Sequence, residues 1–283
     1  MLILLTGSNG FTGKHFEKLA KSYGHDVVCL RADLLDVAAL QKEISDISPS
    51  AVVHLAGISF VAHANNTDFY NVNVVGTTNL LSSLTQLADT PHCVLIASSA
   101  NVYGNAITNP IDETLIPSPV NHYATSKLAM EYMARTYFDR LPIVIARPFN
   151  YTGVGQDPNF VIPKLVNHFA RHESAISLGN LHVEREYNDV RFVCESYLRL
   201  LDKGEPGQIY NICSDQPYTL HHVIEILSSL AGYRIDVNVN PAFIRANEIH
   251  RLCGSPIKLN RCIGESKRFQ LVDTLKWMLQ NAH

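Results

Sequence analysis

Short apolar runs alternate with longer segments of helical periodicity through the first half of the chain. The runs are as short as strands buried on both faces of a sheet, and the segments between them repeat apolar residues at helical spacing. The expected strands are Leu2–Leu5, Val27–Leu30, Ala51–Leu55, Cys93–Ala97 and Ile143–Ala146, and the expected helices are Lys14–Tyr23, Val37–Ile47, Asn71–Leu87 and Tyr123–Phe138. This alternation predicts an α/β fold with a doubly wound parallel sheet.

The second half of the chain is less regular. We expect one more buried strand at Gln208–Cys213 and helices at Leu220–Ala231, with Gly232 as C-cap, and at Leu271–Leu279, with an irregular stretch over 240–264. The pattern predicts a nucleotide-binding domain with a smaller lobe on the carboxyl edge of its strands, and a site in the cleft between them. The expected division gives the domain residues 1–155 with a returning segment of about 186–216, and the lobe residues 156–185 and 217–283.

Composition excludes several classes of function. The 283 residues carry a net charge of −3 at pH 7 with scattered basic residues, which argues against a nucleic-acid-binding or polybasic membrane surface. The apolar start ends at Thr6-Gly7, too short for a membrane span and without the basic leader of a signal peptide, so we expect a cytoplasmic protein. The six cysteines lack CxxC spacing and the thirteen histidines lack ligand spacing such as HExxH, so free thiols and no metal site are expected.

Three glycines with the spacing GxxGxxG follow the first expected strand. Glycine permits a tight turn and lets backbone N–H groups approach a pyrophosphate at a helix N-terminus. The position directly after the first strand predicts a Rossmann-type dinucleotide site. The loop residues that we expect to contact the cofactor are Gly7, Asn9, Gly10, Phe11 and Gly13.

The end of the second strand bears on the choice of dinucleotide. An acidic residue at this point suits the ribose hydroxyls of NADH, whereas Arg31 suits the 2′-phosphate of NADPH. We therefore expect NADPH. Asp33, which precedes Leu34, either caps the next helix or faces the adenine, and it keeps NADH use open; both residues are counted with the cofactor site.

Tyr123 and Lys127 have the spacing that places two side chains on one face of a helix. A neighbouring ammonium favours the phenolate and lowers the tyrosine pKa from ~10 toward neutrality, so Tyr123 is expected to act as a general acid or base on a carbonyl or alcohol oxygen. Ser99, at the end of the fourth expected strand, is placed to hold the same oxygen.

These motifs in this order resemble the extended short-chain dehydrogenase/reductase family over essentially the whole chain. The matching segments are GxxGxxG at 7–13, HLAG at 54–57, SSANVYG at 98–104 and YxxxK at 123–127. The resemblance implies action on a nucleotide sugar, a catalytic trio of Ser99, Tyr123 and Lys127, a cofactor lined by Leu55, Ala56 and Gly57 with Lys127 on the nicotinamide ribose, and a homodimer built from helices around 71–87 and 123–138.

Later segments resemble the GDP-mannose dehydratase and GDP-4-keto-6-deoxymannose reductase branch. By that resemblance Asn150, Lys164, Arg185, Arg245 and Glu248 contact a GDP-sugar, and arginine forks suit a diphosphate. The pattern departs from the family at Glu186, where an aspartate is usual.

The stretch SSANVYG indicates which of two reactions, a reduction or an elimination, the site can carry out. Family dehydratases need an acid where this chain has Asn101, and some have aspartate at Ala100; neither an amide nor a methyl shuttles a proton. The sequence therefore predicts NADPH- or NADH-dependent reduction of GDP-4-dehydro-6-deoxy-D-mannose to GDP-D-rhamnose. The alternatives are a GDP-6-deoxy-D-talose product, a nucleotide-sugar 4-epimerase, and a non-enzymatic NADP(H)-binding protein.

Overall fold

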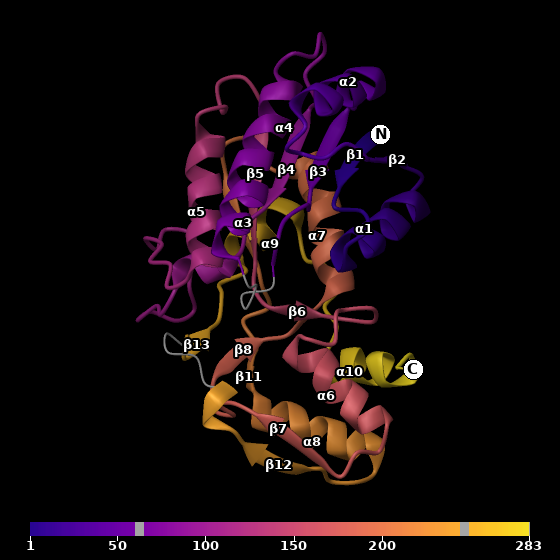
Figure 1. The fold of residues 1–283 in the computed structure, drawn as a ribbon, viewed down its shortest axis with the longest axis vertical. Helices are drawn as coiled ribbons and strands as arrows, with labels where there is room; N and C mark the ends of the chain where they lie inside the picture. Colours follow the sequence, from indigo (N-terminus) through magenta and orange to yellow (C-terminus); the bar gives the residue numbers. More distant parts are fainter. Residues whose placement is uncertain (60–64, 244–248, 283) are drawn as a thin grey trace.

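The computed structural model of the protein describes residues 1–59, 65–243 and 249–282. Its upper part in Figure 1 is built on a six-stranded sheet in which every pairing is parallel. The strands are β1 (Leu2–Thr6), β2 (Asp26–Cys29), β3 (Ala51–His54), β4 (Cys93–Ala97), β5 (Ile143–Pro148) and β10 (Ile209–Ile212), in the order β10-β5-β4-β3-β1-β2. The predicted doubly wound α/β fold is confirmed.

Helices cover both faces of the sheet. The helices α1 (Phe11–Ser22), α7 (Val190–Lys203) and α9 (Ile257–Ile263) pack on one face, and α2 (Val37–Ile47), α4 (Thr77–Leu84) and α5 (His122–Arg135) pack on the other (Figure 1). Alternate residues of each strand pack against the two helix layers. Ile3 and Leu5 lie in the core under α1, α7 and α9, and Leu4 lies in the core under α2, α4 and α5. Because both faces are buried, the strands read as continuous apolar runs rather than as alternating ones.

The strand order reverses at β1, which lies between β2 and β3. In open α/β sheets a crevice forms at such a reversal, outside the carboxyl ends of the strands. The loops that follow β1 and β3 begin at Gly7 and Leu55, so both border this crevice.

The lower part of the molecule is a smaller lobe with its own core. Buried residues of α6 (Val161–Ala170), α8 (Leu220–Ala231) and α10 (Leu271–Gln280) pack together there. The lobe also holds two small sheets, β7 (Ala175–Leu178) with β12 (Asp236–Val239), and β11 (Pro217–Thr219) with β8 (Glu184–Glu186) and β13 (Arg251–Leu252). A further small sheet, β6 (Tyr151–Thr152) with β9 (Asn188–Asp189), follows β5 and leads into α7.

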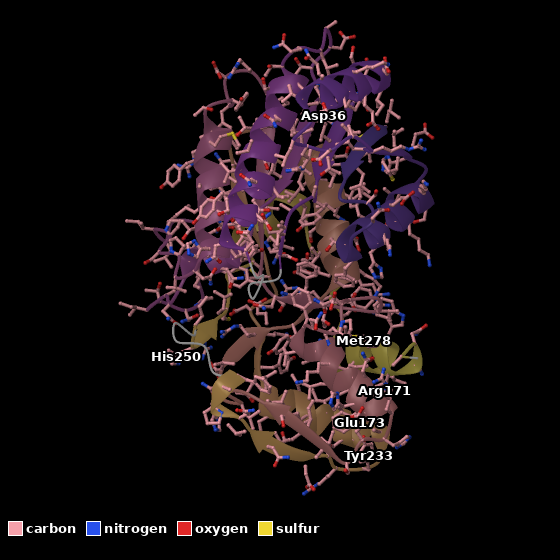
Figure 2. All side chains as sticks on the ribbon, in the orientation of Figure 1. Asp36, Arg171, Glu173, Tyr233, His250 and Met278 are labelled. Carbon is pink, nitrogen blue, oxygen red and sulfur yellow. The ribbon has the colours of Figure 1, made fainter. Side chains whose placement is uncertain are left out.

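Labelled side chains mark the extent of the two parts. In Figure 2, Asp36 lies toward the top of the large part, Tyr233 lies at the foot of the small lobe, and His250 lies near the level where they meet. The His250 backbone N–H donates to Asn105 Oδ1, which follows the short helix η2 (Ala100–Tyr103). This bond ties the returning chain to the loop beyond Ser99.

Several predicted boundaries were wrong. The expected helix over 71–87 is a π-helix, η1 (Asn71–Gly76), followed by α4, and it is preceded by α3 (Asn66–Tyr70). The helices α6 and α7 were not predicted, and the stretch expected to be irregular contains η3 (Pro241–Phe243), β13 and α9. Gly232 is the C-cap of α8 as expected, with φ of 77°.

The division of the chain into domain and lobe stays a prediction. One part of the expected lobe, α9, contributes Leu259 and Ile263 to the core beneath the large sheet. Among the residues that the structure describes, no helix is long and apolar enough to span a bilayer, and no three His, Cys, Asp or Glu side chains gather as a metal site. All six cysteines are free thiols.

Candidate active site

The glycine loop lies against the end of β3. Gly7 has φ of +70°, and a Cβ there would meet the Ala56 backbone nitrogen at 2.6 Å. A Cβ on Gly13 would meet the Gly7 carbonyl oxygen at 2.2 Å. Only glycine therefore fits at these two positions. Gly10 is the N-cap of α1 and brings no side-chain acceptor, and the first turn has no acidic residue, so this helix start suits a phosphate group.

The predicted loop contacts Asn9 and Phe11 differ in their surroundings. Asn9 is exposed, whereas Phe11 is half-buried and stacks on Tyr151 with ring centres 6.1 Å apart. The Tyr151 and Thr12 hydroxyls share a hydrogen bond of 2.8 Å. Tyr151 thus joins the chain after β5 to the first turn of α1.

The loop after β2 carries the residues expected at the adenosine. Arg31 and Asp33 are exposed there and Leu34 is buried. Asp33 Oδ1 accepts from the Leu35 backbone N–H, and the N-cap of α2 is Asp36, so the first of the two alternatives for Asp33, a cap of this helix, does not hold. Sequence reasoning missed Glu43 on α2, which accepts from the Arg31 and Ala32 backbone nitrogens at 3.0 and 2.7 Å and fixes the loop that presents Arg31.

The loop after β3, with Leu55, Ala56 and Gly57, is held by a buried hydrogen-bond chain. Thr6 Oγ1 accepts from the Ala56 N–H and contacts His54 Nδ1 at 2.7 Å. The Thr77 hydroxyl donates to the Asn73 carbonyl and therefore accepts from His54 Nε2, at 2.8 Å. Burial lowers the pKa of His54 to about 3, so it stays neutral. This histidine is structural: it braces the loop.

The Gly57 segment also meets α5, the helix that carries Tyr123 and Lys127. Asn73 Oδ1 accepts from the Ile58 N–H at 3.0 Å, and its amide donates to Ser126 Oγ. A Cβ on Gly57 would stand 2.8 Å from Asn73 Oδ1 and 3.2 Å from Lys127 Nζ. Glycine at this position keeps the space in front of the ammonium open.

Ser99, Tyr123 and Lys127 come together at the carboxyl end of β4. The Asn121 side chain caps α5 by accepting from the Ala124 N–H, so the helix begins just before Tyr123. Lys127, one turn later, donates from Nζ to the Ala97 carbonyl at 2.9 Å. Ser99 begins η2 and is hydrogen-bonded to Tyr123. All three side chains are buried in the protein.

Burial sets the electrostatics of the trio. It raises the pKa of Tyr123, and the Ser99 hydrogen bond works against this rise. The influence that lowers the pKa of the phenol thus comes from Ser99 and not, as the sequence predicted, from Lys127. Burial lowers the pKa of Lys127 to about 8, with Glu131 opposing the change. A lysine tuned to this range and a phenol within reach of a serine are groups suited to proton transfer at a substrate oxygen.

The segment after Ser99 carries no acidic side chain. Ala100 is buried and Asn101 is half-buried, and the Asn101 N–H donates to Ser99 Oγ at 3.2 Å. The structure does bring one carboxylate to this region, Glu131, which accepts from Ser98 Oγ and pairs with Arg147. Its charge is fully buried and neutralised by the arginine.

Three of the residues expected to bind the sugar nucleotide, Asn150, Lys164 and Arg185, lie in or beside the lobe. Asn150 is exposed directly after β5, and its carbonyl accepts from the Asn188 N–H and side-chain amide. Lys164 on α6 donates to the Ser177 carbonyl and lies over the Phe243 ring at 5.2 Å. Arg185 donates to the Glu184 and Ile249 carbonyls. Arg245 and Glu248 lie outside the described residues.

Glu186, where the sequence departs from the family pattern, joins three segments. Its buried carboxylate accepts from the Ser214 N–H and hydroxyl, from the Asn188 amide and from the Gly254 N–H, at 2.6 to 3.1 Å. Burial raises its pKa, and these hydrogen bonds oppose the rise. The glutamate therefore ties β8, the loop after β10 and the chain after β13 into one unit.

Comparison with known proteins decides the family. The profile described as "NAD dependent epimerase/dehydratase family" matches residues 3–213. The chain belongs to this family. The resemblance to the extended short-chain dehydrogenases/reductases is confirmed, and with it the expectation of an enzyme.

Relatives within the family cover nearly the whole chain. A GDP-6-deoxy-D-talose 4-dehydrogenase from Aggregatibacter actinomycetemcomitans is 35% identical over 96% of this chain and 94% of its own. A GDP-6-deoxy-D-mannose reductase from Pseudomonas aeruginosa is 33% identical over 99% and 96%.

Two solved structures of family members superpose closely. The structure of RMD from Pseudomonas aeruginosa complexed with NADPH has a TM-score of 0.91 at 32% identity and covers 99% of this chain and 98% of its own. A Burkholderia cenocepacia J2315 protein, whose epimerase assignment is itself provisional, reaches 0.93 at 45% identity over 98% and 96%.

Proposed function

We propose that the protein uses NADPH, or NADH, to reduce the C4 ketone of GDP-4-dehydro-6-deoxy-D-mannose. The observation that carries the proposal is the grouping of Ser99, Tyr123 and Lys127 at a strand end where the next two residues, Ala100 and Asn101, offer no acid for elimination. Relatives named for GDP-6-deoxy-D-mannose and GDP-6-deoxy-D-talose support the sugar and the base, and a neighbour in complex with NADPH supports the cofactor.

The cofactor site in this proposal runs along the crevice at β1. The glycine loop over 7–13 holds the pyrophosphate with backbone N–H groups, because side chains at Gly7 and Gly13 would collide with the backbone. Arg31 reaches the 2′-phosphate, and Asp33 and Leu34 border the adenosine. The 55–57 segment lines the middle of the cofactor, and the Lys127 ammonium binds the hydroxyls of the nicotinamide ribose.

A dinucleotide held in this site would supply the hydride for C4. Tyr123 gives its phenolic proton to the oxygen at C4, and the Ser99 hydroxyl hydrogen-bonds the same oxygen and keeps it in reach. Burial of the trio strengthens each of these interactions, because solvent screening is weak there.

The GDP moiety in this proposal lies along the lobe. Lys164 and Arg185 are cations on α6 and β8 that suit a diphosphate, and exposed Asn150 faces the sugar. Arg245 and Glu248 complete the proposed contacts from the part of the chain that is not described. We propose GDP-D-rhamnose as the product.

Two other outcomes share this site. The relative from A. actinomycetemcomitans favours GDP-6-deoxy-D-talose as a second candidate product, formed when the hydride arrives on the other face of C4. A 4-epimerase would use the same three residues, since it also needs no acid for elimination. The cytoplasmic location and the homodimer are part of the proposal.

A coupled assay tests the proposal. Freshly made 4-keto-6-deoxy sugars on GDP, UDP and dTDP are supplied with NADPH or NADH, cofactor oxidation is followed by absorbance, and the product is analysed by NMR. We expect turnover of the GDP sugar with the rhamno configuration at C4. A talo product would select the second candidate. Copurified NAD+ with sugar interconversion in the absence of added NADPH would favour the epimerase, and failure to oxidise either cofactor with all three sugars would refute a reductase.

A further inference from the structure

The end of β4 is fastened to α5 at two consecutive residues. The Ala97 carbonyl accepts from Lys127 Nζ at 2.9 Å, and the next residue, Ser98, donates from its hydroxyl to Glu131 Oε1 at 2.5 Å. Lys127 and Glu131 are one helical turn apart and so share a face of α5. The residue after these two contacts is Ser99. The two contacts therefore fix the position of α5 along its axis relative to Ser99, the residue that is hydrogen-bonded to Tyr123.

Glu131 is itself held from several directions. Its side chain is 0% exposed, and Arg147 on β5 binds it through two hydrogen bonds of 2.9 and 2.6 Å. Arg147 also donates to the Tyr103 hydroxyl at 2.9 Å, and Tyr103 donates to Asn211 Oδ1 on β10 at 2.8 Å. A buried ion pair is rarely better for stability than apolar packing of the same volume. The hydrogen bonds that extend from this pair do, however, hold α5, β5, β10 and the end of β4 in one relative arrangement.

We propose that Glu131 is a positioning residue of the active site, which sets the placement of Ser99 through Ser98 and balances the charge of the Lys127 ammonium. The inference rests on the proposed function only where the test below measures kcat, because the binding test needs no turnover. Glu131 does not touch the substrate in this proposal. It acts through the two groups that it holds.

The charge balance follows from the groups around Lys127. Burial lowers the pKa of Lys127 to about 8, and Glu131 opposes that change. The other titratable groups that surround the pair are Tyr123 on α5, His54 on β3, Arg147 on β5 and Tyr103 on η2. Burial lowers the pKa of His54 to about 3 and raises that of Tyr103 to about 12, so both are neutral at pH 7. Glu131, one helical turn after Lys127, is then the acidic residue that shares its face of α5.

The first test removes only the Ser98 contact. Ser98→Ala leaves the Glu131–Arg147 pair intact, and its matched control is Ser196→Ala, a fully buried serine on α7 that bonds within its own helix. We expect Ser98→Ala to lower kcat about 10-fold, since misplacement by ~1 Å can cost ~100-fold, with KM and NADPH affinity unchanged. The control should keep its kcat. A kcat for Ser98→Ala within twofold of the control would overturn the positioning role.

The second test removes the charge. Glu131→Gln is compared with Glu195→Gln, which breaks a partly buried pair with Arg199 on α7. NADPH binding is measured by fluorescence over a range of pH, without sugar. Because the neutral amide no longer favours the ammonium, we expect the alkaline loss of binding to move down by about one pH unit. Ser98→Ala and Glu195→Gln should leave it in place.

An alkaline limb that stays in place in Glu131→Gln would overturn the charge-balancing role. Circular dichroism checks that the variant is folded, and if it is not, the Ser98→Ala result decides the inference. The binding measurement needs no sugar. A wild-type protein that binds NADPH but reduces none of the sugars would therefore refute the proposed function while the Glu131 inference is still tested.

Discussion

Tyr123 carries the proton in the proposed reaction, and its surroundings make one substitution informative. The phenol is buried and hydrogen-bonded to Ser99, and it packs against Phe69 at 6.0 Å between ring centres. Tyr123→Phe keeps this packing and removes only the hydroxyl. We expect kcat for the 4-keto sugar to fall roughly 100-fold or more, while the Kd for NADPH stays within about twofold. Steady-state kinetics and a fluorescence titration measure the two, and near-normal turnover would exclude Tyr123 as the proton donor.

Arg31 tests the choice of cofactor. Glu43 holds the backbone of this loop, so the Arg31 side chain can be changed without loss of those hydrogen bonds. Arg31→Asp should weaken NADPH at least tenfold and leave NADH within a few-fold, because a carboxylate repels a 2′-phosphate and accepts from ribose hydroxyls. The measurement is kcat/KM with each cofactor. The same charge change at exposed Arg140, Arg140→Asp, should alter neither value, and equal losses with both cofactors would place Arg31 away from the phosphate.

Lys127 gives the reaction a pH limit. Its folded-state pKa is lowered from 10.5 to about 8, so the ammonium that binds the ribose is lost as pH rises through 8. We expect kcat/KM and NADPH affinity to fall above about pH 8. Stability changes with the opposite sign: between pH 8 and 10.5 the unfolded chain keeps the proton that the folded chain has released, so this group stabilises the fold as pH rises through that window. If kcat/KM and NADPH affinity do not change up to pH 10, the role of the Lys127 ammonium in binding the ribose is contradicted.

At this scale the sequence predicted the residues whose chemistry is carried by short motifs. Ser99, Tyr123 and Lys127 follow from YxxxK and from the end of an apolar run, and the structure brings them together. Glu131, Arg147 and Ser98 were not predicted as a group. Their contacts join β4, β5 and α5, and no local spacing records a contact that forms only when separate elements pack.

Among the elements, α5 depends on its first turn. Asn121 accepts from the Ala124 N–H at 2.9 Å and so fixes where the helix that carries Tyr123 begins. Asn121→Ala should lower the free energy of unfolding by about 1 kcal/mol and reduce kcat/KM several-fold. The control, Thr219→Ala, removes the corresponding cap of α8 and should cost similar stability without the loss of kcat. Denaturant unfolding and kinetics compare the two. Equal activity in both variants would show that the cap serves stability alone.

The elements that the sequence missed have physical causes. Pro163 lies in α6, but at the third position of the helix, where its missing N–H breaks no intrahelical bond. The hydroxyl of Thr77, the first residue of α4, donates to the carbonyl of Asn73 in η1, and this bond competes with the regular helical pattern and accompanies the π-helical turns. The apolar periodicity of 71–87 continues through that change, so it could not reveal it.

At the scale of the whole molecule, two neighbouring elements expose apolar side chains. Val75 on η1 is 46% exposed, and Tyr132 is 54% exposed on α5, which belongs to the helix layer opposite α1. If these helices form the proposed dimer, Tyr132→Asp should shift the protein to monomers, because it places a charge in an apolar interface. Light scattering after size exclusion measures the mass. Tyr23→Asp, at an exposed tyrosine beside α1, should leave it unchanged, and a wild-type monomer would refute the interface.

The path of the chain also limits how the two parts can move. After β5 the chain enters the lobe, returns to the sheet through α7 and β10, enters the lobe again at β11, comes back at α9 and ends in the lobe with α10. The two parts are thus joined by several backbone connections and not by a single linker, so a relative movement has to bend all of these connections together. We therefore expect entry and exit of a bulky nucleotide to depend on the loops that border the site more than on a large rotation of the two parts.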